Sequence, residues 1–525
     1  MRDFHLPGRS AVHAVNGMAA TSHPLASKVA IETLEAGGNA VDAAIAAGVL
    51  LGIAEPHATG IGGDCFVLLK PPGQDSVIAL NGSGRAPAGL DADALRARGL
   101  TAIGTESVES VTVPGAVDAF CRLSADWGRL GLARSLAPAI RYAEDGIPVA
   151  PRAARDWVAD ATRLNAVGRR HYLSQGAPLS EGQIFRAPGQ AEVLRRIAEG
   201  GARAFYEGEV ADDMLVALNA AGGGHRPEDF ASTEAIWGEP VSGTYQGHDL
   251  IEHPPNGQGA TAILMLNILK HFDLAAMDPF GAHRAHIEAE AAKLAYDARN
   301  RFIADPAHMT RLDHMLSPET AAKLAALIDP RRAMAVPPAT EAIHRDTVNL
   351  CVVDRDRMVV SLIYSVYWGF GSGIASPKFG ILLQNRGAGF TLQSGHPNEA
   401  GPRKRPMHTI IPAMLAKEGR VTMPFGVMGG AYQPCGHARF VTNHLTYGMD
   451  PQSAIEAPRS FADGPVMKVE RGYSDAVRAE LAARGHEVTV PDAPLGGAQA
   501  VLIDDERGVL TGASDPRKDG CALGY

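Results

Sequence analysis

Two hydroxyl side chains, Thr347 and Ser365, stand at the open end of a predicted β-hairpin. The segment TVNLCVV predicts one strand and MVVSLIYSV the returning strand, with a turn at DRDR between them. A loop over residues 354–357 places Thr347 opposite Tyr364, and a neighbouring register places it opposite Ser365. Both registers bring the two hydroxyls within reach across paired strands. Threonine and serine are also ordinary strand residues, so the pair alone leaves a purely structural role open.

The segments before this hairpin predict helices that pack on strands. SHPLASKVAIETLEAGG predicts one helix, and Asn39 caps an alanine-rich second helix from about residue 40 to residue 52. DCFVLLK and SVIALNGS predict short strands, and a helix-rich part follows from about residue 90 to residue 340. Its clearest helix lies in GAHRAHIEAEAAKLAYDARNRFI. Pro337-Pro338 begin an exposed connector before the hairpin, where a cut in the chain would be tolerated.

Composition excludes several classes of protein. The chain has 525 residues, 46% of them apolar, so it is larger than a usual single domain. The net charge of −9 and the absence of a long Lys/Arg block argue against a nucleic-acid partner. No window of about 20 residues lacks charged and polar residues, so no membrane span is expected. The N-terminus lacks the apolar run of a signal peptide, and five scattered cysteines fit a reducing compartment, so we expect a cytoplasmic protein.

Other motifs do not indicate a cofactor or a metal. GIGGD (60–64) and GFGSG (369–373) lack the spacing and the following helix of a dinucleotide-binding loop. The histidines show neither H-E-x-x-H nor zinc-finger spacing. We therefore expect no cofactor and no metal ion.

Several long segments resemble the gamma-glutamyltransferase family, in the family's own order. They are SHPLASKVAIETLEAGGNAVDAAIAAGVLLGIAEPHATGIGGD, AEAAKLAYDARNRFIADP, HRDTVNLCVVDRDRMVVSLIYSVYWGFGSGI, GILLQNRGAGF, KRPMHTIIPAML, FGVMGGAYQP, YGMDPQSAIEAPR and ASDPRKDGCALGY. The resemblance runs from about residue 15 to the last residue. It implies an α+β fold, the four-layer αββα sandwich of N-terminal-nucleophile hydrolases.

The resemblance also implies a precursor that cuts its own peptide bond between Asp346 and Thr347. Residues 1–346 would form a helix-rich large subunit that also contributes sheet strands, and residues 347–525 a β-rich small subunit that carries the nucleophile. The two subunits would form a heterodimer, and a dimer of heterodimers stays open.

The same resemblance assigns the chemistry to four residues. Thr347 would be the nucleophile, and its freed α-amino group, with an ordinary pKa of about 8, would take the hydroxyl proton. Ser365 would orient that hydroxyl. Gly429 and Gly430 would donate backbone N–H groups to the oxyanion, since glycine lets the substrate approach closely. An isolated Gly-Gly pair is otherwise typical of a turn.

Departures from the family pattern concern substrate recognition. Ser83 stands at the place of the family's carboxylate-binding arginine, and Arg85 follows two residues later, where it could bind a carboxylate or lie on the surface. Arg386 replaces a glutamine and Gly389 an aspartate, so an acidic group would be attracted in place of an ammonium. The segment 391–402 is too short for the lid loop of many transpeptidases.

Further departures complete the expected binding site. Tyr367 replaces an expected asparagine, and His408-Thr409 replace a serine pair. We expect the substrate to contact these residues: Arg85, Tyr367, Asn385, Arg386, His408 and Thr409. The pattern resembles a lidless subgroup that includes oxamate amidohydrolase.

The expected activity is hydrolysis of the amide bond of a small acidic substrate such as oxamate. Within the enzyme class, the alternatives are a gamma-glutamyltranspeptidase or glutathione hydrolase and a cephalosporin (glutaryl) acylase. A metal-dependent amidohydrolase is a further alternative. A catalytically inactive binding homologue is the alternative from a different class, and the intact set of Thr347, Ser365, Gly429 and Gly430 argues against it.

Overall fold

Two antiparallel sheets of seven strands each form the centre of the molecule. The computed structural model describes residue 5, residues 8–335 and residues 347–525. The first sheet has the order β1 (Val12–Ala14), β18 (Val509–Ser514), β17 (Gly497–Asp504), β13 (Arg420–Met428), β12 (Ala413–Lys417), β9 (His248–Glu252) and β8 (Val241–Tyr245). The second has the order β19 (Cys521–Gly524), β2 (Met18–Thr21), β10 (Val348–Val353), β11 (Val359–Ser365), β3 (Asp64–Lys70), β4 (Ile78–Gly82) and β7 (Ile236–Gly238).

The two sheets pack face to face, and both faces of β10 are buried, including its one polar residue, Asn349, whose Nδ2 donates to the carbonyl of Leu362. Successive side chains of a strand point to opposite faces. Leu350 and Val352 pack into the core between the second sheet and its helices, whereas Cys351 and Val353 pack into the core between the sheets. Both faces of the strand are therefore buried, and VNLCVV has no polar face to expose.

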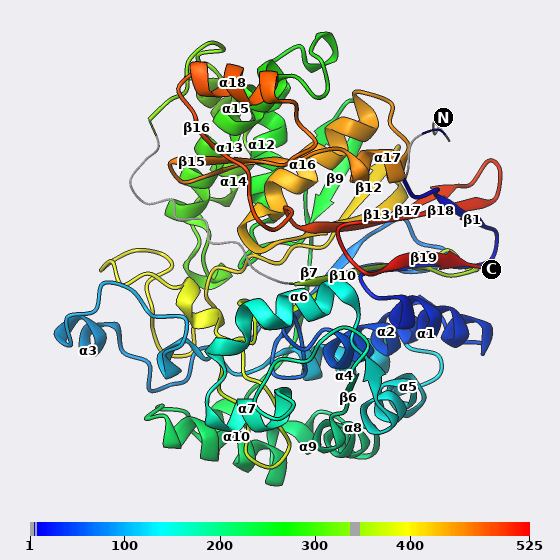
Figure 1. The fold of residues 1–525 in the computed structure, drawn as a ribbon, viewed down its shortest axis with the longest axis vertical. Coiled ribbons are helices and arrows are strands. Elements are labelled where there is room, and N and C mark those ends of the chain that lie inside the picture. The colour runs from blue at the N-terminus through cyan, green and yellow to red at the C-terminus, as the bar shows by residue number, and fades with distance from the viewer. Residues whose placement is uncertain (1–4, 6–7, 336–346) are drawn as a thin grey trace.

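Helices cover the outer face of each sheet, as Figure 1 shows. The second sheet is covered by α1 (Pro24–Glu35), α2 (Ala40–Ala54) and α4 (Ala116–Trp127), with α5 (Leu132–Asp145) packed on α2. The first is covered by α12 (Gly259–Leu269) and α16 (Gln433–Leu445), with α13 (Ala282–Phe302) packed on α12. Asn39 caps α2 by accepting hydrogen bonds from the N–H groups of Val41 and Asp42, as its sequence predicts. The four-layer αββα sandwich is thereby confirmed.

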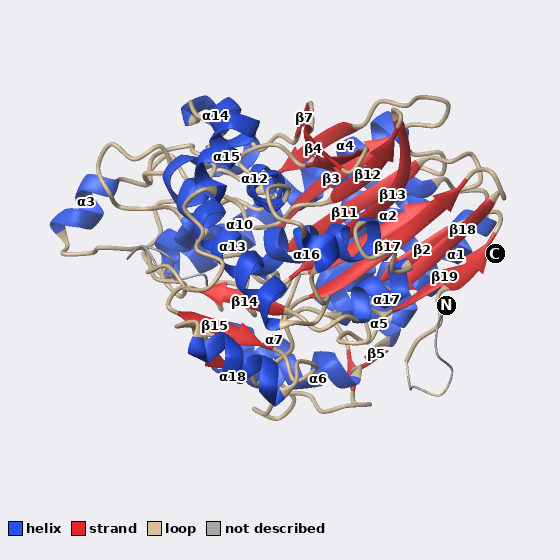
Figure 2. Ribbon diagram, turned by 90° about the horizontal axis from the view of Figure 1, so that it is seen from above, coloured by secondary structure: helices blue, strands red, loops and turns tan. Residues whose placement is uncertain are grey.

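The remaining elements surround these layers (Figure 2). Helices of the outer parts are α3 (Ala92–Ala97), α6 (Pro151–Asp160), α7 (Ala166–Tyr172), α8 (Pro188–Gly200), α9 (Arg203–Tyr206), α10 (Glu209–Ala220), α11 (Pro227–Ala231), α14 (Leu312–Leu316), α15 (Pro318–Ala325), α17 (Pro451–Glu456) and α18 (Asp475–Ala483). Smaller sheets contain β5 (Ile147–Pro148) with β6 (Ile184–Phe185), and β14 (Ser460–Asp463) with β15 (Val466–Val469) and β16 (Glu487–Thr489). Short 3-10 helices include η5 (Arg386–Gly389) and η6 (Gly430–Tyr432). No helix of the described part is long and apolar enough to cross a bilayer.

The predicted hairpin is present, but its turn is longer than expected. Val353 pairs with Val359 and Val348 with Tyr364, so the turn spans residues 354–358 and not 354–357. Arg357 takes a positive φ of 59°, which a tight reversal of the chain requires. The continuation of this register sets Thr347 against Ser365. Asp346 and the whole of the predicted connector lie outside the described residues.

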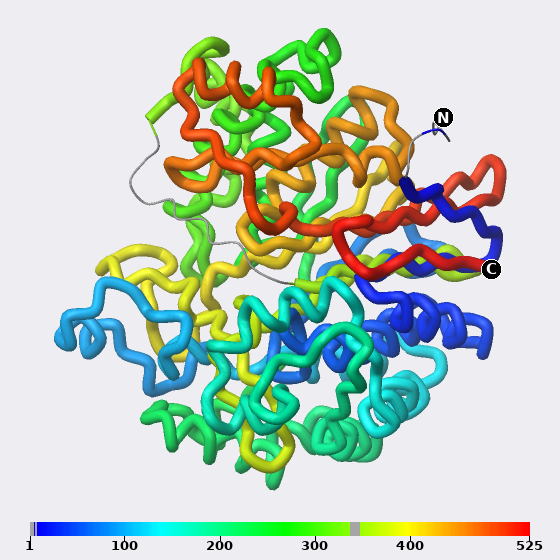
Figure 3. Tube along the Cα trace, viewed as in Figure 1, coloured from blue at the N-terminus to red at the C-terminus, as the bar shows by residue number. Residues whose placement is uncertain are grey.

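Each sheet contains strands from before Thr347 and strands from after it. β10 lies between β11 and β2, β11 pairs with β3, and β13 is joined through β12 to β9. The two chain ends also meet, since β1 pairs with β18 and β19 with β2, as the blue and red segments of Figure 3 show. Residues 1–346 and 347–525 therefore share their sheets, and their separation into two subunits stays a prediction.

Candidate active site

Thr347 and Ser365 meet at the end of the hairpin, beside β10 and β11. The Thr347 hydroxyl donates to the Ser365 Oγ over 3.3 Å, and the backbone N–H of Tyr367 donates to the same Oγ over 2.8 Å. The Thr347 side chain is almost enclosed, with 1% of its residue surface exposed. The N–H of Tyr367 thus fixes the position of the Ser365 hydroxyl, which in turn fixes the position of the Thr347 hydroxyl.

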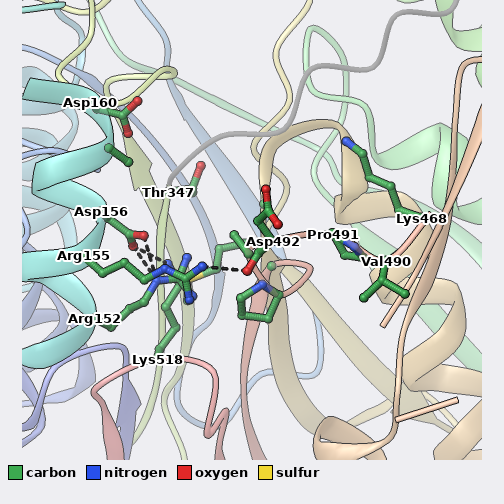
Figure 4. A pocket seen from close by; sticks show the side chains of 16 residues that line it. Arg152, Arg155, Asp156, Asp160, Thr347, Lys468, Val490, Pro491, Asp492 and Lys518 are labelled. Carbon is green, nitrogen blue, oxygen red and sulfur yellow. Dashed lines mark hydrogen bonds and ion pairs between the residues drawn. The ribbon is translucent and has the colours of Figure 1, made fainter. Parts of the chain in front are cut away.

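A cavity of about 620 Å³ opens onto Thr347. Figure 4 shows its charged walls, which come from α6, from the segment after β16, from Lys468 on β15 and from Lys518 before β19. Its lining comprises Arg152, Arg155, Asp156, Ala159, Asp160, Thr347, Met428, Gly429, Lys468, Val490, Pro491, Asp492, Ala493, Pro494, Gly496 and Lys518. Thr347 and Gly429, two of the four predicted catalytic residues, therefore share one cavity.

The Gly429-Gly430 pair lies where β13 ends and η6 leads into α16. Both residues have positive φ values, 121° and 56°, and a Cβ on Gly429 would lie 2.9 Å from the Cα of Gly496. A side chain is therefore excluded at Gly429. The first N–H groups of a helical segment have no intrahelical acceptor, so they are suited to an oxyanion. Of the pair, Gly429 lines the cavity of Thr347.

Gln258 holds this turn against the neighbouring segment. Its Nε2 donates to the carbonyl oxygens of Gly430 over 3.1 Å and Thr409 over 2.6 Å. Its Oε1 accepts from Arg299 Nη1 over 3.0 Å. The sequence does not single out Gln258, because a buried glutamine has no recognisable motif.

Arg386 is fully buried behind Tyr367. Its Nη1 donates to Thr409 Oγ1 over 2.8 Å, and its guanidinium carbon lies 4.0 Å from the centre of the Tyr367 ring. Its Nε and Nη2 have no hydrogen-bond partner among the described residues. Burial lowers the pKa of Arg386 to about 10, so the side chain stays cationic at neutral pH. The structure thus brings three predicted binding residues together around a buried cation whose hydrogen-bonding capacity is not filled.

Asn385 holds the chain that follows β11. Its Oδ1 accepts from the N–H of Trp368 over 3.2 Å, and its Nδ2 donates to the carbonyl of Thr105 over 2.7 Å. Tyr367, between Ser365 and Trp368, has a φ of 80°. Both polar groups of the Asn385 side chain therefore hold protein backbone, and they fix the strained turn that presents the Tyr367 N–H to Ser365.

His408 pairs with a buried acid. Its Nε2 lies 3.0 Å from Asp64 Oδ2, and the other oxygen of Asp64 accepts from the N–H groups of Gly84 and Gly115. Burial, with Arg386 nearby, lowers the pKa of His408 to about 3, so the imidazole is neutral and donates to the carboxylate. This pair supports the segment before Thr409 and does not line the cavity of Thr347.

Arg85 lies elsewhere. It lines a separate cavity of about 450 Å³ with Trp237, Met309 and other residues. Its Nη1 donates to the carbonyl of Arg403 over 2.9 Å and lies 3.4 Å from Asp305 Oδ2. The structure does not bring Arg85 to the cavity of Thr347.

The sequence does not predict the charged wall on α6. Arg152, Arg155 and Asp156 recur at helical spacing, a pattern that is typical of a solvated helix face. Arg152 Nε donates to both oxygens of Asp156 over 2.8 and 2.7 Å. Burial alone would raise the pKa of Asp156, but His57, Lys518 and Arg152 together hold it well below its usual range. No signal in the sequence placed this helix beside Thr347.

One group of side chains could in principle hold a metal ion among the described residues, namely His286, Glu290 and His486. His286 Nδ1 and His486 Nε2 lie 2.7 Å apart, and His286 Nε2 lies 2.8 Å from the carbonyl of Asp329. Glu290 accepts from Lys293 Nζ and from the N–H of Met334, each over 2.7 Å. The ligand atoms therefore already bind protein groups, and none of these residues lines the cavity of Thr347.

Known proteins resemble this chain over almost its whole length. The gamma-glutamyltranspeptidase family model matches residues 26–525. A glutathione hydrolase-like proenzyme of Bacillus subtilis is 36% identical over 519 residues, covering 97% of this chain and 98% of the relative. An oxamate amidohydrolase proenzyme of Klebsiella pneumoniae is 36% identical over 535 residues, covering 98% of this chain and 99% of the relative. The solved structure of cephalosporin acylase from Bacillus halodurans is 38% identical and has a TM-score of 0.93, covering 100% of this chain and 99% of that chain.

Proposed function

Because the chain belongs to the gamma-glutamyltranspeptidase family, we propose that this enzyme is an amidohydrolase that uses Thr347 as its N-terminal nucleophile. Its fold is the αββα sandwich of N-terminal-nucleophile hydrolases. The observation that carries the proposal is the 3.3 Å hydrogen bond from Thr347 to Ser365, at a cavity that Gly429 also lines. The named relatives are proenzymes, which supports maturation by cleavage before Thr347.

The proposed reaction begins with cleavage of the peptide bond between Asp346 and Thr347. The new α-amino group of Thr347 accepts the proton of the Thr347 hydroxyl as Oγ1 attacks the substrate carbonyl carbon. The carbonyl oxygen becomes an oxyanion, which the N–H groups of Gly429 and Gly430 stabilise. The C–N bond then breaks, the proton passes to the leaving amine, and an ester of Thr347 remains. Water attacks this ester, which returns the hydroxyl and releases the acid.

Ser365 is proposed to orient the nucleophile. It accepts from both the Thr347 hydroxyl and the Tyr367 N–H, which fixes the position of the nucleophile. Asn385 and the stacking of Arg386 on Tyr367 hold the turn that carries this N–H. These contacts give Asn385, Arg386 and Tyr367 positioning roles in the proposal.

An acidic acyl group is the proposed substrate class. A buried guanidinium is costly unless anions or hydrogen-bond acceptors satisfy it. Arg386 has two nitrogen atoms without such partners among the described residues, so the carboxylate of a small acidic amide, such as oxamate, would complete it. Arg85 has no part in this proposal, because Asp305 and the carbonyl of Arg403 already bind its guanidinium in another cavity.

A second candidate is an acylase that releases a larger amine. A cavity of about 620 Å³ is in the range that holds drug-sized ligands, and it exceeds what a two-carbon amide needs. The likeness to cephalosporin acylase is consistent with this candidate. Turnover of oxamate, of gamma-glutamyl-p-nitroanilide and of glutaryl amides would distinguish the candidates. A clear preference for the gamma-glutamyl compound, with stimulation by amine acceptors, would contradict the proposed substrate class.

Denaturing electrophoresis of the purified protein tests the mechanism. Cleavage would give two bands, about two-thirds and one-third of 55.2 kDa, with TVNLCVV at the N-terminus of the smaller one. Thr347→Ala is expected to give one inactive full-length band, and Thr347→Ser to retain cleavage in part. A full-length wild-type chain that hydrolyses amides would refute the N-terminal nucleophile.

A further inference from the structure

Two histidines from remote segments face each other outside the cavity of Thr347. His286 belongs to α13, and His486 lies between α18 and β16. His286 Nδ1 and His486 Nε2 are 2.7 Å apart, and both residues are buried. The sequence predicts no metal ion here, because the two histidines stand 200 positions apart and form no recognised metal-binding motif.

The second nitrogen of His286 determines which tautomer this ring adopts. Its Nε2 lies 2.8 Å from the carbonyl oxygen of Asp329, which can only accept, so Nε2 carries the proton. Burial lowers the pKa of both histidines, that of His486 to about 3, so both rings are neutral at pH 7. His286 Nδ1 therefore directs a lone pair at His486 Nε2. A ring N–H that donates to a backbone carbonyl is the bond that commonly orients a histidine as a metal ligand through its other nitrogen.

Glu290 places a carboxylate beside the two imidazoles. It follows His286 by four residues on α13, so the two side chains lie on one face of the helix. One ligand atom from each of His286, Glu290 and His486 lies within 4.8 Å of the other two. The Glu290 carboxylate accepts from Lys293 Nζ and from the N–H of Met334, but its two oxygens offer about four acceptor positions in all. Positions for a metal ion therefore remain while both bonds stay.

From this arrangement we infer that His286, Glu290 and His486 form a zinc-binding site. Two imidazoles and one carboxylate suit Zn²⁺, and a water molecule completes a tetrahedral set. Two nitrogens at about 2.0–2.1 Å from a tetrahedral ion lie about 3.3 Å apart, so the rings must separate by about 0.6 Å from their present 2.7 Å. Zinc takes the place of the hydrogen between the rings. His486 keeps a single proton, which moves through solvent from Nε2 to Nδ1.

The zinc site joins parts of the chain from before and after Thr347. His286 and Glu290 precede this residue, and His486 follows it. A bound zinc ion would therefore link the two pieces of the cleaved enzyme through coordinate bonds, at a distance from the nucleophile. This link rests on the proposed cleavage, whereas zinc binding itself requires only the fold.

Calorimetric titration of zinc chloride into the whole protein, after treatment with a chelator, tests the site. The wild type is expected to bind one zinc ion, and His286→Ala and His486→Ala to bind it about tenfold or more weakly. Glu290→Gln should also weaken binding, and it keeps an acceptor for the Met334 N–H, so it serves where a histidine variant does not fold. X-ray absorption of the zinc-loaded wild type should show two imidazole nitrogens at about 2.0–2.1 Å.

His283→Asn is the matched control, since His283 lies on the same helix and contacts Arg484, but is not one of the three ligands. It should bind zinc as the wild type does. The Thr347→Ala chain should also bind zinc, because it keeps all three ligands, so the site can be measured even if the proposed cleavage fails. Absence of zinc binding by the wild type, or binding that the two histidine variants leave unchanged, would overturn the site.

The link between the two pieces has its own measurement. Saturating zinc should raise the melting temperature of the cleaved wild type by about 2 °C or more, because the ion binds the folded state. The His486→Ala protein should show no such rise. A melting temperature that zinc leaves unchanged in a wild type shown to bind the ion would refute the link.

Discussion

The guanidinium of Arg386 lies 4.0 Å from the centre of the Tyr367 ring, and the N–H of Tyr367 is the group that fixes Ser365. Arg386 and Tyr367, which the sequence suggests as substrate ligands, are therefore also linked through Ser365 to the proposed nucleophile. Binding of an acidic acyl group and orientation of Thr347 would depend on the same buried cation.

Replacement of Arg386 is expected to lower both binding and turnover. Arg386→Gln removes the stacking on Tyr367 and the charge, and hydrogen bonds to charged groups contribute about 1.5–3 kcal/mol, so kcat/KM for oxamate should fall by about tenfold or more. Arg386→Lys should rescue little, because an ammonium cannot stack and fork as a guanidinium does. Steady-state kinetics on the cleaved protein measures this. A variant with a raised KM and an unchanged kcat would limit Arg386 to substrate binding.

Arg85 provides a contrast within the same set of predictions. It is partly exposed and lies in another cavity, so Arg85→Ala should leave kcat/KM within about twofold of the wild type. The same assays serve for this variant. A loss comparable to that of Arg386→Gln would show that the substrate reaches Arg85, and the assignment of the acyl carboxylate to Arg386 would have to be abandoned.

Gly429→Ala should impair both the fold and the chemistry. A Cβ at this φ of 121° would approach the Cα of Gly496 to 2.9 Å, so the turn must move and its N–H groups with it. Loss of one oxyanion donor typically costs about 10²–10³ in kcat. Gly448→Ala is the control, since Gly448 has a φ of 64° but no atom within 4 Å of its added Cβ. It should lower the melting temperature slightly and leave kcat unchanged, whereas equal effects of the two variants would assign the loss to backbone strain alone.

Acid is expected to destabilise the protein before its carboxylates titrate. Burial lowers the pKa of His408 to about 3 and of His253 to about 4, from an ordinary value near 6.5. Between these values the unfolded chain binds protons that the folded chain does not, so stability falls as pH falls. Each such histidine contributes a slope of up to about 1.4 kcal/mol per pH unit.

Melting temperatures between pH 7 and pH 4 measure this effect. His408→Asn should reduce the slope of melting temperature against pH, and His271→Asn, at an exposed position, should not. A stability that is constant from pH 6.5 to pH 4, or a slope unaffected by His408→Asn, would contradict the predicted protonation.

The sequence is informative about this fold because its strands and helices are locally consistent. The cap at Asn39 and the mostly apolar strand at residues 348–353 follow from residue type alone. The turn of the hairpin does not, because Arg357 adopts a positive φ that residue preferences disfavour. The resulting register could be predicted only to within one residue.

The site is less predictable than the fold, since it depends on distances between remote segments. Arg85 stands two residues after the place that the resemblance gives to a carboxylate-binding arginine, and only the structure shows that it lines a cavity other than that of Thr347. Arg155 has no motif, and only the packing of α6 against residues 490–494 brings it to the cavity that Thr347 also lines. The stacking of Arg386 on Tyr367 joins residues 19 positions apart through a turn that no pattern encodes.

The shared sheets have a consequence for the maturation of such an enzyme and for the dissociation of its two pieces. β10 begins one residue after Thr347 and is held between β2 and β11, so the hydroxyl pair can form only after distant parts of the chain have met. Cleavage would therefore report that folding is complete, and a misfolded precursor would stay inert. Once cut, the two pieces could part only by breaking both sheets, so their dissociation and their unfolding would be one event, with no route back for the separated pieces to the uncut chain.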